Sequence, residues 1–168
     1  MGEINRKKGG KNMLVVIAEK EELEIVKEAG YEGVPVLITG VGGMNVINTM
    51  KDISRKEIIV NIGYCGSNSI EIGKLVHVRN VRTYHPNAEF DERSQLQFIS
   101  TLGEYDCYTA TDFVTHTDIK EPCVFDMELA FIKALGFERI ISIKKVSDNL
   151  KKKEYKKTIG ENKNDRKS

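Results

Sequence analysis

The stretch Cys123-Val-Phe-Asp-Met-Glu-Leu-Ala-Phe-Ile-Lys-Ala-Leu-Gly136 predicts the end of a strand that turns directly into a helix, with Glu128 at the junction. A second apolar run, residues 139–146, predicts the next strand and ends in Ser147-Asp148-Asn149. If the two strands are parallel neighbours, Glu128 and Asp148 emerge at the same edge of the sheet. Because ligands of open α/β sheets bind at that carboxyl edge, the two acids mark a candidate pocket.

Further apolar segments predict strands that surround this unit, beginning near residues 14, 36, 58, 76 and 106. Helices are expected between several of them, the first over residues 18–29 and the second after Gly43, with Met44 and Met50 in the core. Residues 75–81 alternate like a half-exposed strand of a curled, mixed sheet. The order of elements indicates a single α/β domain over residues 13–150.

Glycine-bearing turns follow several of these strands. Gly40-Val-Gly-Gly43 opens a helix, where backbone N–H groups can face an anion or a polar ligand, and Gly63 follows the third strand. The pattern lacks the glycine spacing of a dinucleotide-binding turn and the Gly-Lys-Ser/Thr of a P-loop. Gly40, Gly42 and Gly63 are equally consistent with tight turns and no ligand.

Composition favours a water-soluble protein of the cytoplasm. The chain has 168 residues, of which 40% are hydrophobic and 30% charged, and no apolar run reaches the length of a spanning helix. Residues 1–12 form a polar extension without the apolar middle of a signal peptide, and Met13 is a plausible natural start. The three cysteines, without a C-x-x-C pair, indicate reduced core thiols, and no metal site is expected.

The net charge of +1 conceals a basic C-terminal segment. Residues 151–168 carry eight basic and three acidic side chains, and residues 1–12 carry four and one, which leaves a charge of about −7 on residues 13–150. A basic tail can touch nucleic acid or anionic lipid, but this one has a single aromatic residue and no stacking series. We expect a solvated, partly frayed tail, and neither nucleic acid nor membrane as a partner.

Several motifs occur in the order in which a known family carries them. They are Ala18–Leu23, Thr39–Gly42, Asn61–Gly66, Ile72–Val76, Thr111–Val114, Phe125–Glu128 and Val146–Asp148. On these motifs, residues 14–150 resemble the purine nucleoside phosphorylase/uridine phosphorylase superfamily, and most closely its methylthioadenosine/S-adenosylhomocysteine nucleosidases. The resemblance implies a three-layer α/β/α domain with a mixed, partly curled central sheet. It also implies cleavage of the N-ribosidic bond of a purine nucleoside, without a cofactor.

The resemblance assigns the chemistry to three acids. Glu128 would bind the 2′- and 3′-hydroxyls of the ribose and favour the positive charge that develops on the sugar. Asp148, with a raised pKa, would protonate N7 of the purine, and Glu22, ionised, would activate water.

The substrate-binding surface follows from the same motifs. Met127 would pack under the sugar, Phe113 and Phe125 would sandwich the base, and the backbone of Val114 would read the base edge. Gly42 and Gly63, in the glycine turns, complete the expected substrate-binding residues.

Water is preferred over phosphate as the nucleophile. Phosphorylases of the superfamily place an arginine where this chain has Asn61, and another in the first loop, where this chain has Glu19, Glu21 and Glu22. These acids would repel phosphate. Phosphorolysis and a shortened nucleoside-binding relative with little or no catalysis remain the alternatives. The resemblance also implies a homodimer or larger homo-oligomer.

The chain is shorter than the family pattern in two places. Residues 86–110 leave too little room for the helix that normally precedes the Asp112-Phe113 segment. Residues 151–168 are expected to form a charged tail in place of the long helix that follows the Ser147-Asp148 turn. Tyr64 stands where the family has a small residue beside the sugar.

Overall fold

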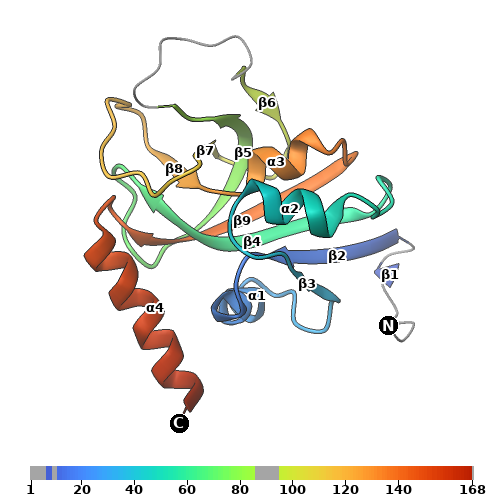
Figure 1. Cartoon of the computed structure of the whole chain (residues 1–168), viewed down its shortest axis with the longest axis horizontal. Coiled ribbons are helices and arrows are strands. Elements are labelled where there is room, and N and C mark those ends of the chain that lie inside the picture. The colour runs from blue at the N-terminus through green and yellow to red at the C-terminus, as the bar shows by residue number, and fades with distance from the viewer. Residues whose placement is uncertain (1–6, 9–10, 86–94, 168) are drawn as a thin grey trace.

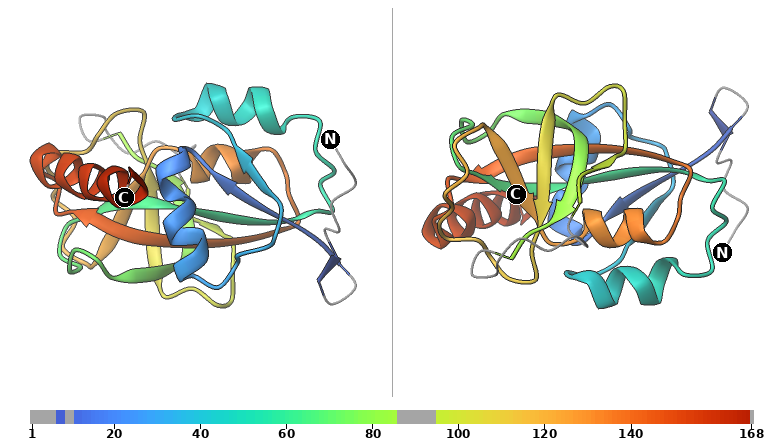
Figure 2. Two further views of the ribbon diagram at one scale, coloured as in Figure 1. Left: turned by 90° about the horizontal axis from the view of Figure 1, so that it is seen from below. Right: turned by 90° about the horizontal axis from the view of Figure 1, so that it is seen from above.

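The computed structural model describes residues 7–8, 11–85 and 95–167. A mixed, curled sheet forms the middle layer, with α2 and α3 against one face and α1 and α4 on the other (Figures 1 and 2). The helical elements are η1 (Lys20–Glu22), α1 (Leu23–Glu28), α2 (Gly43–Met50), α3 (Leu129–Ala134) and α4 (Lys152–Lys167). The three-layer α/β/α architecture predicted from the sequence is confirmed.

Nine strands make up the sheet in the described part of the chain. They are β1 (Lys7–Lys8), β2 (Lys11–Ile17), β3 (Val36–Ile38), β4 (Ile58–Ser67), β5 (Leu75–Thr83), β6 (Gln97–Phe98), β7 (Tyr105–Thr109), β8 (Cys123–Asp126) and β9 (Arg139–Asp148). All seven strands predicted from apolar runs are present. The two-residue strands β1 and β6 lie in segments whose pattern predicts no strand.

The long strands β4 and β9 are parallel partners over almost their whole length and form the spine of the sheet. β2 continues the sheet on one side of β4, parallel to it, and β3 pairs with β2 as an edge strand. On the other side β5 runs antiparallel to β9, and β7 and β8 curl back until Phe125 of β8 pairs with Gly66 of β4. This curl closes one end of the sheet into a partial barrel.

The expectation that the two acid-bearing strands are parallel neighbours is wrong. β8 pairs with β7 and, antiparallel, with β4, whereas β9 pairs with β4 and β5. Glu128 and Asp148 therefore line one cavity from strands that both pair with β4, because the sheet curls, and not along a common edge of adjacent parallel strands. The sequence contains no local signal for this pairing, which joins residues far apart in the chain.

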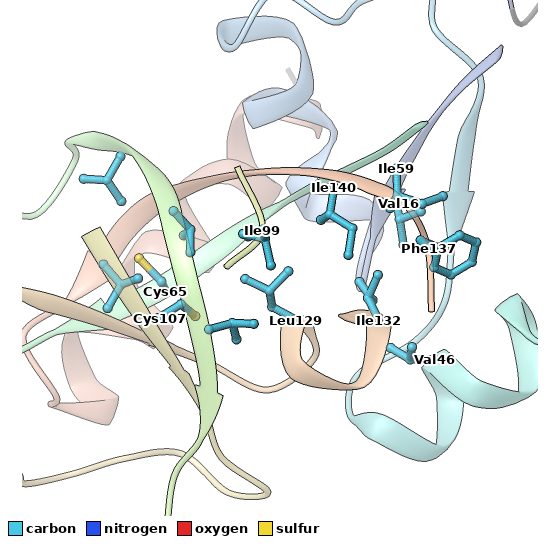
Figure 3. Close-up of a cluster of buried hydrophobic side chains, with 14 of the residues drawn as sticks. Val16, Val46, Ile59, Cys65, Ile99, Cys107, Leu129, Ile132, Phe137 and Ile140 are labelled. Carbon is cyan, nitrogen blue, oxygen red and sulfur yellow. The ribbon is translucent and has the colours of Figure 1, made fainter. Parts of the chain in front are cut away.

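Two apolar clusters fasten the helices to the sheet. The larger lies under α2 and α3 and includes the fully buried Leu129, Ile132 and Phe137 (Figure 3). The smaller lies under α1, where Ile25 and Val26 pack against β2, β4 and β9. Since burial of each such side chain contributes about 1.5–3 kcal/mol, these clusters hold the two outer layers in place.

Two sequence predictions fail at the periphery. Lys152–Lys167 form α4, not a frayed tail, and Ile159 of this helix is buried. Met50 is buried as predicted, but Met44 is 71% exposed, since it lies on the outer face of the two-turn helix α2.

Cys65, Cys107 and Cys123 are buried and unpaired, which confirms that they are core thiols. Among the described helices, none is long and apolar enough to cross a membrane.

Candidate active site

A cavity of about 290 Å³ opens between the ends of β4, β8 and β9. Residues of η1, of α4 and of the loop after β7 complete its lining. Seven of the nine residues predicted for the site line it. These are Glu22, Phe113, Val114, Phe125, Met127, Glu128 and Asp148. The other two, Gly42 and Gly63, lie outside the lining, and each contacts one of the carboxylates instead. The motifs thus converge on one place, although they are dispersed along the chain.

Glu22 is held by backbone groups and is 6% exposed. Its Oε1 accepts hydrogen bonds from the amides of Ala18 (2.9 Å) and Glu19 (3.0 Å), and its Oε2 accepts one from Tyr64 (2.7 Å). A Cβ on Gly63 would collide with Glu22 Oε2, so the glycine makes room for the carboxylate. Burial raises the pKa of Glu22, while these amides and the Lys144 ammonium act in the opposite direction. Glu22 is therefore a fixed carboxylate with a raised pKa, not a solvated surface acid.

Glu128 lies at the junction of β8 and α3, as predicted. Its Oε2 accepts a hydrogen bond of 2.8 Å from the amide of Gly42, whose φ of +91° points that N–H toward the carboxylate at the start of α2. Burial, together with the negative charge of Asp126, raises the pKa of Glu128 to about 7. The glycine turn thus binds a side chain of the protein itself, and the other carboxylate oxygen remains for a ligand.

A buried ion pair that the sequence analysis missed lies beneath these acids. Lys144 Nζ is 3.1 Å from Asp126 Oδ2, and both side chains are 1% exposed. Asp126 also accepts hydrogen bonds from the Thr109 hydroxyl (2.5 Å) and the Leu129 amide (2.8 Å). Burial acts to raise the pKa of Asp126, but the Lys144 ammonium and these hydrogen bonds outweigh it and lower the pKa. Asp126 is therefore the ionised member of the group, and it also anchors the start of α3.

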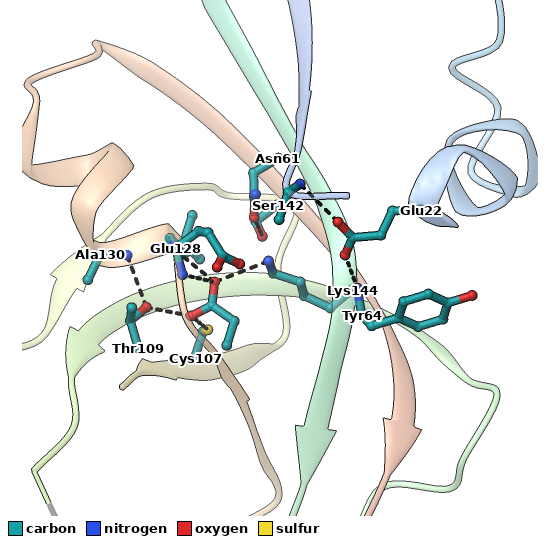
Figure 4. Close-up of polar contacts among 12 residues, drawn as sticks. Glu22, Asn61, Tyr64, Cys107, Thr109, Glu128, Ala130, Ser142 and Lys144 are labelled. Carbon is teal, nitrogen blue, oxygen red and sulfur yellow. Dashed lines mark hydrogen bonds and ion pairs between the residues drawn. The ribbon is translucent and has the colours of Figure 1, made fainter. Parts of the chain in front are cut away.

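We call Lys144 and the three carboxylates of Asp126, Glu22 and Glu128 the floor of the cavity. In it, one ammonium group lies among three carboxylates. Lys144 lies between Glu22 and Glu128 (Figure 4), and the negative charges of Asp126, Glu128 and Glu22 raise its pKa even though burial acts to lower it. One positive charge cannot neutralise three negative ones in a medium of low dielectric constant. Glu22 and Glu128, whose pKa values are raised, therefore hold a proton up to a higher pH than Asp126, whose pKa is lowered.

Asp148 occupies the opposite end of the cavity and is 1% exposed. Its Oδ2 accepts from the Ser147 hydroxyl (2.7 Å) and its Oδ1 from the Leu150 amide (2.9 Å), and burial raises its pKa. A Cβ on Gly66 would stand 2.8 Å from Asp148 Oδ1, so β4 yields to this carboxylate as it does to Glu22. Leu150 has a φ of +72°, a strained value for a branched residue that places its amide on Asp148.

Aromatic side chains form the walls. Phe125 packs against Tyr84 and Tyr108 at ring-centroid distances of 5.2 and 5.7 Å. Phe113 lies 5.7 Å from the ring of Tyr155, which α4 brings to the cavity. The two phenylalanines thus line the cavity from different elements. Phe125 contacts two tyrosine rings and Phe113 contacts one.

Three lining or supporting residues escaped the sequence analysis although two of them carried a signal. Lys144 lies four residues before Asp148 in β9, and Asp126, the last residue of β8, lies two residues before Glu128, so each is close in sequence to a predicted acid. The third, Tyr155, carried no such signal, because α4 is charged at ten of its 16 positions and lacks an apolar stripe.

Of the comparisons with known proteins, the one with solved structures identifies the fold. No protein-family model and no curated protein matches the chain. Among solved structures, a Helicobacter pylori MTAN variant with 5′-methylthioadenosine in its active site is similar over 90% of this chain and 91% of its own, with a TM-score of 0.71 and 14% identity. MTAN denotes a 5′-methylthioadenosine/S-adenosylhomocysteine nucleosidase.

Two other relatives extend the pattern. Futalosine hydrolase of Helicobacter pylori has a TM-score of 0.69 and 12% identity, with coverage of 90% and 92%. The 5′-methylthioadenosine/S-adenosylhomocysteine nucleosidase of S. pneumoniae, bound to a transition-state inhibitor, has a TM-score of 0.67 and 16% identity. The similarity covers 89% of this chain and 92% of that one. The chain therefore has the fold of these nucleosidases and of futalosine hydrolase, the fold that the sequence motifs predicted.

Proposed function

We propose that the protein hydrolyses the N-ribosidic bond of a purine nucleoside and releases the free base. The observation that carries this proposal is the gathering of Glu22, Glu128 and Asp148 around one cavity, the first and last buried, Glu128 partly buried, and each with a raised pKa. Carboxyl groups whose surroundings set their protonation are what this reaction requires. The relatives of the same fold, which include nucleosidases for methylthioadenosine and S-adenosylhomocysteine, support substrates of that kind.

Asp148 would act as the acid. With the base between Phe113 and Phe125, the protonated carboxyl group gives its proton to N7, which makes the purine a better leaving group. Burial keeps the proton on Asp148 at higher pH than in water. The backbone of Val114, next to Phe113, would read the base edge, and Met127 would pack under the sugar.

Glu128 and Glu22 would serve the sugar. Glu128 accepts hydrogen bonds from the 2′- and 3′-hydroxyls, and its charge favours the cationic ring that forms as the base departs. Glu22, fixed by three backbone amides, orients a water molecule and takes its proton. Gly42 and Gly63 would act through these carboxylates, the first by its hydrogen bond to Glu128 and the second by leaving space for Glu22.

The charge of the cavity favours water over phosphate as the nucleophile. Among the described residues that line it, six are acids and none is lysine or arginine: Glu19, Glu22, Asp112, Asp126, Glu128 and Asp148. The nearby cation, Lys144, is already paired with Asp126. Asn61, where the phosphorylases have an arginine, is buried and accepts a hydrogen bond from Ser142. A phosphate dianion would therefore meet repulsion without a clamp.

Release of free purine, measured with and without phosphate, tests the proposal. We expect 5′-methylthioadenosine or a related nucleoside to yield adenine and a free sugar at a rate independent of phosphate. A rate that requires phosphate, with a sugar 1-phosphate as product, would establish the phosphorolytic alternative. Nucleoside binding without base release at high enzyme concentration would establish a binding protein without catalysis.

The predicted homodimer or larger oligomer remains part of the proposal. The exposed apolar side chains of α2 and β3 support it, since Met44 is 71% and Ile38 47% exposed and Val41 beside them lines the cavity. We expect light scattering to give at least twice the mass of the chain. A monomer at micromolar concentration would rule the oligomer out.

A further inference from the structure

Two residues that the proposed chemistry leaves unused face each other at the outer part of the cavity. Glu19, at the turn after β2, and Tyr155, on α4, both line it. The Tyr155 hydroxyl donates a hydrogen bond of 3.3 Å to Glu19 Oε2. Neither residue touches the ion pair of the floor or the Asp148 carboxylate in any hydrogen bond of the described structure.

The stereochemistry of a nucleoside decides what these residues would meet. In a β-nucleoside the base and C5′ leave the ribose on the same face, while the 2′- and 3′-hydroxyls and the attacking water lie on the other. Phe113, on the base side, packs against Tyr155, whereas Glu22 and Glu128 belong to the water and hydroxyl side. With the base on Phe113, the 5′ substituent would extend on the same face of the ribose, toward Tyr155 and the Glu19 carboxylate that its hydroxyl contacts, whereas the backbone amide of Glu19 holds Glu22.

We infer that Glu19 and Tyr155 form the 5′ subsite of the cavity, and that it selects a nucleoside whose 5′ substituent carries an amine, an inference that rests on the proposed function. A carboxylate and a phenol oxygen present acceptors at this point, so an ammonium group gains charge-assisted hydrogen bonds there. A methylthio group would gain none, and it would remove the charged Glu19 carboxylate from water with only the long hydrogen bond from Tyr155 on Oε2. An anionic 5′ group would be repelled.

The ionisation of the pair is consistent with this subsite. Burial and the negative charge of Glu19 raise the pKa of Tyr155, so the phenol keeps its proton at neutral pH and Glu19 supplies the charge. Lys20, which follows Glu19, is exposed to solvent, and the Tyr155 hydroxyl is the partner of Glu19 Oε2 in the described structure. A 5′-ammonium could bridge both oxygen atoms by displacing this long hydrogen bond.

The test compares two nucleosides that differ only at C5′, 5′-amino-5′-deoxyadenosine and 5′-methylthioadenosine. We expect kcat/KM of the wild-type protein to be about 10- to 100-fold higher for the amine, the effect of one charge-assisted hydrogen bond. Glu19→Gln should reduce this ratio about 10-fold or more, and Glu19→Met should invert it. Glu24→Gln, which removes an exposed acid from α1 without changing the cavity lining, is the matched control and should keep the wild-type ratio.

Dissociation constants separate the two proposals. Calorimetric titration of both nucleosides measures the preference even if no base is released, so a binding preference for the amine that Glu19→Gln abolishes supports the subsite although hydrolysis fails. Base release from both nucleosides with equal kcat/KM, or a wild-type ratio retained in Glu19→Gln and Glu19→Met, would overturn the subsite and leave the hydrolase standing.

Discussion

The two ends of the cavity are built in different ways. At the sugar end, Glu22 and Glu128 are held by backbone amides and lie beside the Asp126–Lys144 pair, which strands β8 and β9 position. At the base end, Asp148 depends on a strained Leu150, and the cover comes from a loop and from α4. The floor of the cavity is thus fixed by strands of the sheet, whereas its cover is formed by a loop and by α4.

The largest difference between the ends should appear when the floor loses its cation. Lys144→Met leaves Asp126 and its neighbours buried without a positive charge, and we expect a loss of about 3–5 kcal/mol in the free energy of unfolding. Lys145→Met is the matched control, because Lys145 forms a partly exposed ion pair of 2.8 Å with Glu28. That variant should lose about 0–1 kcal/mol. Equal urea-unfolding curves for the two variants would contradict the role given to Lys144.

A smaller change in the free energy of unfolding, a gain and not a loss, is expected when Glu128 is replaced. Its pKa is about 7 in the folded protein, compared with 4.5 for an exposed glutamate, so the folded state binds the proton more tightly. The stabilisation from that proton is complete below about pH 4.5 and is lost as the pH rises through 7. Because glutamine cannot ionise, Glu128→Gln should be roughly 3 kcal/mol more stable than the wild type at pH 8 and equal to it at pH 4.

Unfolding free energies across this pH range check the prediction, and turnover checks its cost. Glu128→Gln should bind the ribose hydroxyls poorly and lose most of its activity, since the charge that destabilises the fold is the charge that favours the transition state. A stability difference that does not depend on pH would mean that Glu128 does not titrate in this range. Turnover at the wild-type rate would remove Glu128 from the mechanism.

The smallest effect on stability is expected at the cover. Tyr155→Ala removes the ring contact with Phe113 and the hydrogen bond to Glu19 while leaving the sheet intact. We expect a loss of about 1 kcal/mol in stability, because the side chain is only partly buried, with weaker nucleoside binding as the main result. Lys156→Ala, an exposed neighbour on α4, should change neither quantity. A loss as large as that of Lys144→Met would mean that cover and floor form one cooperative unit.

The sequence predicts the acids of the cavity better than the residues that support and cover them, for a physical reason. Glu128 and Asp148 stand at strand ends, so local pattern and motif order together locate them. Asp126 and Lys144 pair through the curl of the sheet, which depends on contacts between residues distant in sequence. Tyr155 belongs to a helix stabilised by specific anchors, such as the Thr158 hydroxyl on the Ser147 carbonyl at 3.0 Å, rather than by an apolar stripe.

The proposed reaction depends most directly on the proton of Asp148, and one measurement isolates it. Single-turnover release of adenine from 5′-methylthioadenosine, or from 5′-amino-5′-deoxyadenosine where that nucleoside reacts faster, should be about 100-fold or more slower in Asp148→Asn than in the wild type. Asp118→Asn, at an exposed loop position outside the cavity lining, should react at the wild-type rate. Equal rates in Asp148→Asn and the wild type, or no adenine from any of the three proteins, would contradict the proposed hydrolysis.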